Sequence, residues 1–238
     1  PRLLSLCFLI GIGVFLAIPF GVIDPTAQTS ALTEKPSQTL MKDLHDDNLN
    51  LNSIPHTAGP SAFISVWDTS ITNYHSSETN KITLPLIYND IYNFEVDWGD
   101  GSENDTITEY DQAEITHEFP VDDDQFNYTV TISGTIQGWC FDRYGDYIKL
   151  IEISQWGNFS LGNMIDGGYF YGCENLQITA TDVPDLSSTT DLRQAFRGCE
   201  SIREDGNFGN WDVSEISTME QMFYECDNFN QSLNSWDV

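Results

Sequence analysis

The chain is an acidic polypeptide of 238 residues, with 37 Asp and Glu, nine Lys and Arg, and a formal net charge of −28. This charge disfavours nucleic-acid binding, which depends on basic side chains that displace counterions from phosphates. It also disfavours adsorption to anionic lipid headgroups. Hydrophobic residues make up 40% of the chain, which is enough for a packed core.

The N-terminal part has two segments of different composition. Residues 3–23 are an uncharged, mainly apolar run that follows Arg2. Such a run indicates either a signal peptide or a membrane anchor within residues 1–23, and both interpretations stay open. Residues 24–61 are rich in Thr, Ser, Asn, Asp and Pro and are predicted to be a disordered linker. We expect an extracellular protein, at the cell surface or secreted, that contacts a membrane through residues 3–23 only.

Residues 62–138 are predicted to form an antiparallel β-sandwich. Tyr92, Phe94, Val96 and Trp98 alternate with polar residues, which is typical of a half-buried strand. The Asp-Gly pair that follows at residues 100–101 favours a hairpin turn. Further strands are expected at residues 64–69, 81–86, 114–119 and 128–133. Several short strands with turn signals and no helical period indicate a sandwich.

Part of this region resembles the polycystic-kidney-disease (PKD) type of domain. The resemblance rests on FEVDWGDGS at residues 94–102, THEF at 116–119 and YTVTI at 128–132. It implies an Ig-like sandwich of the kind found on cell-surface and secreted proteins. It also implies that Asp97, Asp100 and His117 are turn and strand residues and not catalysts.

One loop departs from the PKD pattern. Asp122, Asp123, Asp124 and Asn127 stand where a tight glycine turn is usual. The three aspartates either bind Ca²⁺, which takes several oxygen ligands, or form an acidic turn without a metal. No metal site is assigned from the sequence.

The C-terminal region, residues 139–238, contains an internal repeat. YFYGCENL at residues 169–176, AFRGCESI at 195–202 and MFYECDNF at 222–229 align, with phenylalanines 26 and 27 residues apart. Such a period is typical of leucine-rich repeats. Residues 219–226 carry apolar side chains at the spacing of a short helix. The predicted core of the repeats consists of Phe170, Cys173, Phe196, Cys199, Met222, Phe223 and Cys226.

The last repeat is similar to that of BspA-type leucine-rich surface proteins, through WDVSEISTMEQMFYECDNFNQ at residues 211–231. The expected fold is therefore β-rich: an Ig-like (PKD-like) antiparallel β-sandwich followed by a short leucine-rich-repeat-type α/β solenoid. The resemblance implies a cell-surface adhesin. Because the chain begins with Pro1 and stops at Val238 within a repeat motif, we expect a fragment with an incomplete array.

No catalytic or cofactor constellation is visible in the sequence. His75 and His117 are the only histidines in residues 62–238, Cys140 has no activating neighbour, and no nucleotide-binding or metal-binding motif occurs. We expect a non-enzymatic protein without a cofactor that presents its repeats to an extracellular protein or glycan. The alternatives are a self-assembling envelope protein and an accessory module of an exported hydrolase.

Two kinds of side chain are candidates for modification. Four sequons mark acceptors for glycans on an exported chain, at Asn104, Asn127, Asn158 and Asn230. The repeated cysteines lie on apolar stripes, where a free thiol behaves as a small hydrophobe. We therefore predict buried, reduced thiols, although exported proteins commonly form disulfides.

Overall fold

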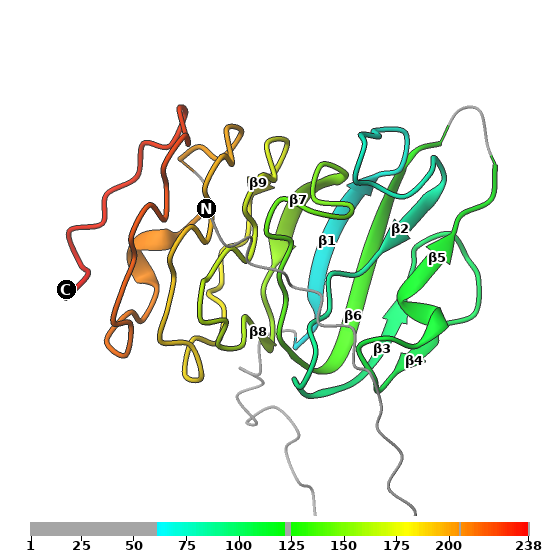
Figure 1. Ribbon diagram of the computed structural model, residues 1–238, viewed down its shortest axis with the longest axis horizontal. Helices are drawn as coiled ribbons and strands as arrows, with labels where there is room; N and C mark the ends of the chain where they lie inside the picture. Colours follow the sequence, from blue (N-terminus) through cyan, green and yellow to red (C-terminus); the bar gives the residue numbers. More distant parts are fainter. Residues whose placement is uncertain (1–60, 122–124, 205, 238) are drawn as a thin grey trace, which may run out of the picture. The chain divides into compact units, whose positions relative to one another are not determined.

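The computed structural model describes residues 61–121, 125–204 and 206–237, which are arranged as Figure 1 shows. Its strands are β1 (Phe63–Asp68), β2 (Lys81–Thr83), β3 (Tyr92–Asp97), β4 (Asp105–Ile107), β5 (Thr116–Glu118), β6 (Asn127–Gln137), β7 (Leu150–Gln155), β8 (Phe159–Ser160) and β9 (Gln177–Ile178). Two short 3-10 helices are present, η1 (Ala113–Ile115) and η2 (Phe208–Asn210). The described part of the chain has no α-helix, so the predicted β-rich character is confirmed.

Seven strands form one sheet in the order β4-β3-β6-β1-β7-β9, with β8 paired to β6. The long strand β6 runs antiparallel to both β1 and β3. In β3 the side chains of Tyr92, Phe94 and Val96 are buried and the residues between them are exposed, as the alternation predicts. Strands β2 and β5 form a separate two-stranded sheet.

The turn after β3 is held by carboxylates. Asp97 accepts a hydrogen bond from the backbone N–H two residues later. Asp100 accepts two hydrogen bonds from Ser102 and lies 2.8 Å from Nε2 of His117, which stacks on Trp98. Partial burial alone would raise the pKa of Asp100, but the bonds from Ser102 and His117 outweigh it and lower that pKa. Asp100 and His117 therefore tie this turn to β5.

The large sheet continues beyond residue 138. Strand β1 pairs antiparallel with β7, β6 pairs parallel with β8, and β7 pairs parallel with β9. The boundary expected between residues 138 and 139 therefore falls inside one sheet. Stacked and edge-on aromatic rings fill the core across this boundary: Phe63, Trp139, Trp156, Phe159 and Phe170.

The expectation of a sandwich followed by an α/β solenoid is wrong. No leucine-rich-repeat solenoid is seen among the described residues, and the short helix expected at residues 219–226 is absent. Gln221 and Glu225 in that segment adopt left-handed backbone angles (φ 58° and 62°), which interrupt a right-handed helix. The helical spacing of apolar side chains is instead produced by successive tight turns.

Successive repeats are joined by parallel backbone hydrogen bonds. The N–H of Phe170 donates to the carbonyl of Ala195 at 2.8 Å, and the N–H of Phe196 donates to the carbonyl of Met222 at 3.0 Å. Equivalent residues of the aligned segments therefore lie side by side. This register positions the side chains of the surface described below.

Several expectations fall on residues that the structure does not describe. They are the signal or anchor at residues 1–23, the linker (apart from residue 61) and the Asp122–Asp124 loop. No helix among the described residues is long and apolar enough to cross a membrane.

Candidate binding surface on the repeat array

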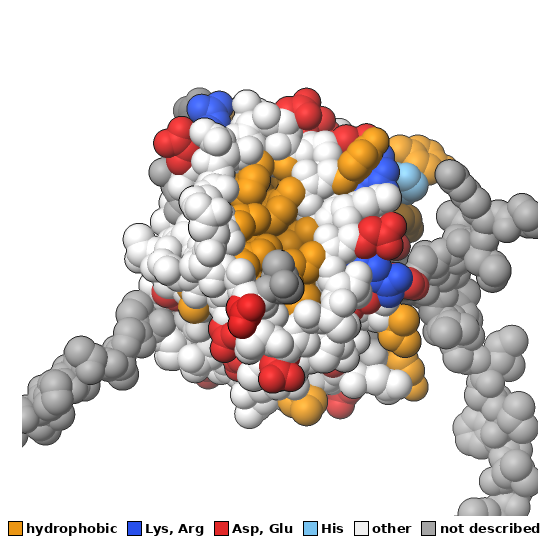
Figure 2. All heavy atoms as spheres, turned by 90° about the vertical axis from the view of Figure 1, so that its left-hand side faces the viewer, with side chains coloured by type: hydrophobic (Ala, Val, Ile, Leu, Met, Phe, Trp, Pro, Cys, Tyr) orange, Lys and Arg blue, Asp and Glu red, His pale blue; other side chains and the backbone are white. Residues whose placement is uncertain are grey.

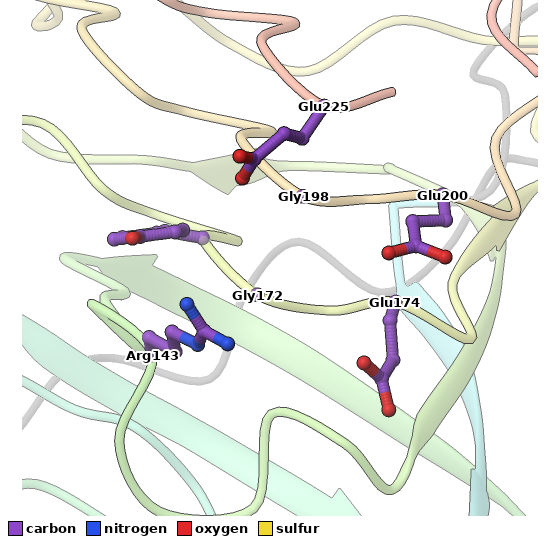
Figure 3. Close-up of a pocket in the computed structure, with 7 residues that line it drawn as sticks. Arg143, Gly172, Glu174, Gly198, Glu200 and Glu225 are labelled. Atoms are coloured by element: carbon purple, nitrogen blue, oxygen red, sulfur yellow. The ribbon is translucent and has the colours of Figure 1, made fainter. Parts of the chain in front are cut away.

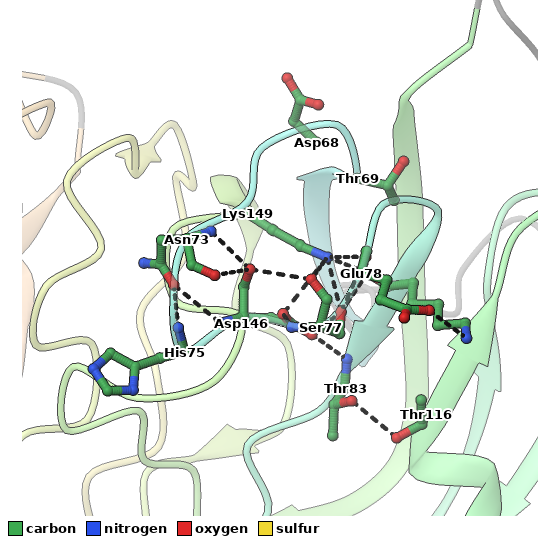
Figure 4. A network of polar contacts seen from close by, with 12 residues as sticks. Asp68, Thr69, Asn73, His75, Ser77, Glu78, Thr83, Thr116, Asp146 and Lys149 are labelled. Carbon is green, nitrogen blue, oxygen red and sulfur yellow. Dashed lines mark hydrogen bonds and ion pairs between the residues drawn. The ribbon is translucent and has the colours of Figure 1, made fainter.

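A buried polar cluster lies between β7 and the segment that leads to β2 (Figure 4). The side chain of Lys149 is fully buried, and its ammonium donates to the hydroxyl and carbonyl of Ser77 and to the carbonyls of Glu78 and Lys81 at 2.7–3.1 Å. Asp146 lies 3.6 Å from the same ammonium. Desolvation lowers the pKa of Lys149, and the charge of Asp146 opposes this shift.

The contact of 2.8 Å between Ser77 and Lys149 has the residue types of a nucleophile–base pair. Its surroundings favour a different role. A lysine that acts as a base must be neutral, whereas backbone carbonyls stabilise the charged ammonium. Asp146 accepts hydrogen bonds from Ser77 and from the backbone N–H of Thr83. The cluster is suited to hold residues 77–83 against the segment 146–149, which directly precedes β7, and we call it the clamp.

A ladder of alternating arginine and tyrosine side chains runs along one side of the repeats. We call Arg143, Tyr171, Arg197 and Tyr224 the arginine–tyrosine ladder. The Arg143 guanidinium carbon lies 6.0 Å from the Tyr171 ring centroid, and that of Arg197 lies 5.1 Å from Tyr171 and 4.9 Å from Tyr224. These are cation–π distances. Backbone hydrogen bonds between neighbouring turns, such as Arg143 N–H to the Tyr171 carbonyl at 3.0 Å, keep the side chains in line.

An exposed aromatic patch adjoins the ladder, formed by Tyr74, His75 and Tyr144. The His75 ring lies 5.1 Å from each tyrosine ring, and the tyrosines are 95% and 54% exposed. Asn73 accepts the N–H of His75 and donates to the hydroxyl of Tyr147, which fixes the loop that carries the patch. Tyr144 directly follows Arg143 in the chain, so the backbone connects the patch to the first residue of the ladder.

A small pocket of about 50 Å³ opens beside the ladder (Figure 3). Its lining residues are Arg143, Tyr171, Gly172, Glu174, Gly198, Glu200 and Glu225. Figure 3 shows the carboxylates of Glu174 and Glu200 on one side of the glycines and the Arg143 guanidinium on the other.

The pocket depends on Gly172. A side chain at Gly172 would lie 2.8 Å from Cγ of Arg143, so only glycine leaves this space open. The ladder and the pocket beside it therefore bring together aromatic rings, N–H donors and carboxylate acceptors.

The residues proposed from the sequence lie in different places. All four sequon asparagines are exposed: Asn104, Asn127, Asn158 and Asn230. His117 belongs to the turn after β3, whereas His75 is part of the aromatic patch. Among the described residues no group of three or more His, Cys, Asp or Glu is placed to hold a metal ion.

The repeat-core residues stack along the array. The Phe170 and Phe196 rings lie 5.2 Å apart, and Phe196 and Phe223 lie 5.9 Å apart, nearly parallel in both pairs. Cys173, Cys199, Met222 and Cys226 are buried.

The repeat thiols contact backbone carbonyls. The thiol of Cys199 donates to the carbonyl of Phe170 at 3.1 Å, and that of Cys226 donates to Phe196 at 2.9 Å. Burial raises the pKa of Cys199, and raises that of Cys226 to about 12. No disulfide joins the four cysteines of the described region.

The sequence did not lead us to predict the arginine–tyrosine ladder or the cluster around Lys149. The alternation Tyr171, Arg197, Tyr224 was present in the aligned repeats, directly after each phenylalanine, and could have been found there. Arg143 lies outside the repeat alignment and has no such signal. Lys149 and Ser77 are 72 residues apart, and nothing in the sequence links them.

Comparison with known proteins bears on the C-terminal part of the chain. Residues 148–238, less than half of the chain, match a family described as "Mycoplasma protein of unknown function, DUF285". The chain matches no curated protein and no solved structure. No leucine-rich-repeat or PKD match was found, so the assignment to BspA-type leucine-rich repeat proteins with a PKD-like domain is wrong. The DUF285 family is associated with surface proteins of Mycoplasma, which favours a surface location. Residues 148–238 are therefore similar to the DUF285 family.

Proposed function

We propose that this chain is a non-enzymatic protein of the cell exterior that binds an extracellular glycan through the aromatic patch and the arginine–tyrosine ladder. The observation that carries the proposal is a set of exposed tyrosines in contact with His75 and of arginines stacked on tyrosines, in a protein whose net charge is −28. Tyrosine and arginine are enriched in binding interfaces. Residues 1–23 would export the chain, as a cleaved signal or as an anchor.

The chemistry of the surface favours a glycan without negative charge. Tyr74 offers an almost fully exposed ring, against which the apolar face of a sugar can pack. Arginine N–H groups and the carboxylates of Glu174 and Glu200 supply donors and acceptors for hydroxyl groups. The acidic surroundings oppose an anionic ligand.

The proposal assigns no catalytic role to the titratable groups. The Ser77 hydroxyl is hydrogen-bonded to Asp146 and Lys149, and His117 is bonded to Asp100 and stacked on Trp98. Both clusters have the contacts expected of structural groups.

The test is binding of the purified protein to an array of neutral and anionic glycans. We expect binding to neutral glycans that falls about tenfold in the Tyr74→Ala/Tyr144→Ala double variant, as for loss of an interface hot spot. Tyr88→Ala is the matched control, because Tyr88 is 67% exposed and lies outside the patch. Equal binding by the double variant, or an equal loss in the control, would contradict the proposal.

A further inference from the structure

Two tyrosine rings meet at the surface beside β4, the edge strand of the large sheet that lies farthest from the repeats. The ring centroids of Tyr88 and Tyr110 are 5.3 Å apart, with an angle of 78° between the ring planes. Tyr88 is 67% exposed and Tyr110 is partly buried. Tyr88 lies in the loop before β3 and Tyr110 in the loop after β4, and Figure 1 shows both strands on the side opposite the C-terminal turns. We call this pair of rings the Tyr88–Tyr110 corner.

Side-chain hydrogen bonds hold both loops that carry the corner. The hydroxyl of Tyr92 accepts the backbone N–H of Ile87 at 2.9 Å, which closes the loop before β3. The side-chain amide of Gln112 accepts the N–H of Thr108 at 2.7 Å and donates to the carbonyl of Thr106 at 2.9 Å, which closes the loop after β4. The two rings are therefore positioned before any ligand arrives, and a ligand that binds them loses little affinity to the ordering of loops.

The corner belongs to a strongly acidic part of the protein. Before residue 143 the described part of the chain contains a single base, Lys81, whose ammonium is paired with two glutamates. Figure 2 shows that several Lys and Arg side chains lie instead on the side of the repeats. Desolvation raises the pKa of Tyr110, and the charges of the exposed Asp111 and Glu109 raise it further. The negative charge around these rings favours a cationic ligand.

We infer that the Tyr88–Tyr110 corner binds the trimethylammonium group of a ligand such as choline. Aromatic faces attract cations through the ring quadrupole, and quaternary ammonium groups are the ligands that proteins recognise in this way. Such a group has no N–H to satisfy, so ring faces and nearby carboxylates are sufficient for it. A metal ion needs several oxygen ligands, and no described group of three or more His, Cys, Asp or Glu is placed to supply them. This site is distinct from the glycan surface, which depends on Tyr74 and Tyr144.

Choline is the probe, and saturation-transfer NMR of its methyl protons measures its binding to the purified chain. We expect saturable binding that Tyr88→Ala weakens about two- to fivefold, as for loss of an exposed cation–π contact. Tyr88→Phe should bind choline as the unmodified chain does, because the ring face makes the contact and not the hydroxyl. Tyr74→Ala is the matched control, since Tyr74 is 95% exposed and belongs to the aromatic patch. This control should leave choline binding unchanged.

Competition identifies the chemistry and the source of the ligand. Tetramethylammonium should displace choline, and ethanolamine, which carries a primary ammonium on the same chain, should do so more weakly. Co-sedimentation with phosphatidylcholine vesicles that is lost in Tyr88→Ala would identify a lipid headgroup as the source, whereas choline binding without co-sedimentation would identify a free ligand. Stronger displacement by ethanolamine, equal choline binding by Tyr88→Ala, or an equal loss in Tyr74→Ala would overturn the inference. Loss of choline binding in Tyr88→Ala with glycan binding intact would separate the two sites.

Discussion

At the scale of single residues, Lys149 is the most consequential charge in the described core. Its ammonium satisfies three backbone carbonyls and a hydroxyl, and it balances Asp146 in a buried setting. A buried ion pair contributes little net stability, but removing one partner leaves the other charge uncompensated. The position of the segment around Ser77 and Glu78 therefore depends on the side chain of Lys149.

Lys149→Met should lower the free energy of unfolding by about 3–5 kcal/mol, because Asp146 would be left buried without its cation. Urea denaturation followed by tryptophan fluorescence measures this change. The matched control is Lys81→Met, whose ion pairs with Glu78 and Glu118 are exposed to solvent, and its effect should be much smaller. Similar losses in the two variants would show that Lys149 is not a clamp.

Gly99 and Gly101 lie in the same turn. Alanine variants of the two residues distinguish the cost of a strained backbone from the cost of a steric clash. Both have left-handed angles (φ 78° and 82°), but a Cβ at Gly99 would lie 2.2 Å from the carbonyl oxygen of Thr129, whereas one at Gly101 meets nothing within 4 Å. Gly101→Ala should cost about 1 kcal/mol from strain alone. Gly99→Ala should cost a further ~1–3 kcal/mol from overpacking. Equal midpoints in thermal or urea unfolding would contradict this account.

At the scale of elements, each repeat is a series of tight turns and not a helix. Some of its backbone groups bond within a turn, three residues apart, and others bond to a neighbouring repeat. The thiols take part in this arrangement. Cys199 and Cys226 each donate to the carbonyl of a phenylalanine in the preceding turn, from buried positions. The array thus uses cysteine both as an apolar core residue and as a link between turns.

The buried thiols should resist iodoacetamide until the array unfolds, because reagent access and thiolate formation are both suppressed. Mass spectrometry of the native protein should show Cys173, Cys199 and Cys226 unmodified, and all three modified in urea. An added thiol at the exposed position Ser214, made by Ser214→Cys, should react at once and serves as the control. A Cys173–Cys199 or Cys199–Cys226 disulfide in most molecules would refute the prediction.

At the scale of the whole molecule, the first property to test is whether the chain lies outside the cell. If residues 3–23 direct export or anchor the chain, residues 24–238 lie outside the cell. Protease added to intact cells should then digest this region, as followed by immunoblot, while a cytoplasmic marker survives. Protection of residues 24–238 in sealed cells, with digestion after lysis, would exclude the surface assignment.

The sequence by itself determined the features that appear as a regular spacing of residues along the chain. The alternation around Phe94 predicted β3, and the spacing of Phe170, Phe196 and Phe223 predicted a repeat with these rings in its core, although not its backbone structure. A strand period or a repeat can be recognised from the order of residues alone, because it does not depend on which distant residues are in contact. The PKD and leucine-rich interpretations failed because short motifs were extended to whole folds.

Only the tertiary structure decided which distant segments meet. The pairing of β1 with β7 joins the expected domains into one sheet, and the same folding places Arg143 beside Tyr171 and Lys149 beside Ser77. These partners depend on strand register and on long-range hydrogen bonds, which leave no period in the sequence. The helical spacing at residues 219–226 was overridden for the same reason, since carbonyls of this segment accept hydrogen bonds from the preceding repeat and not from within a helix.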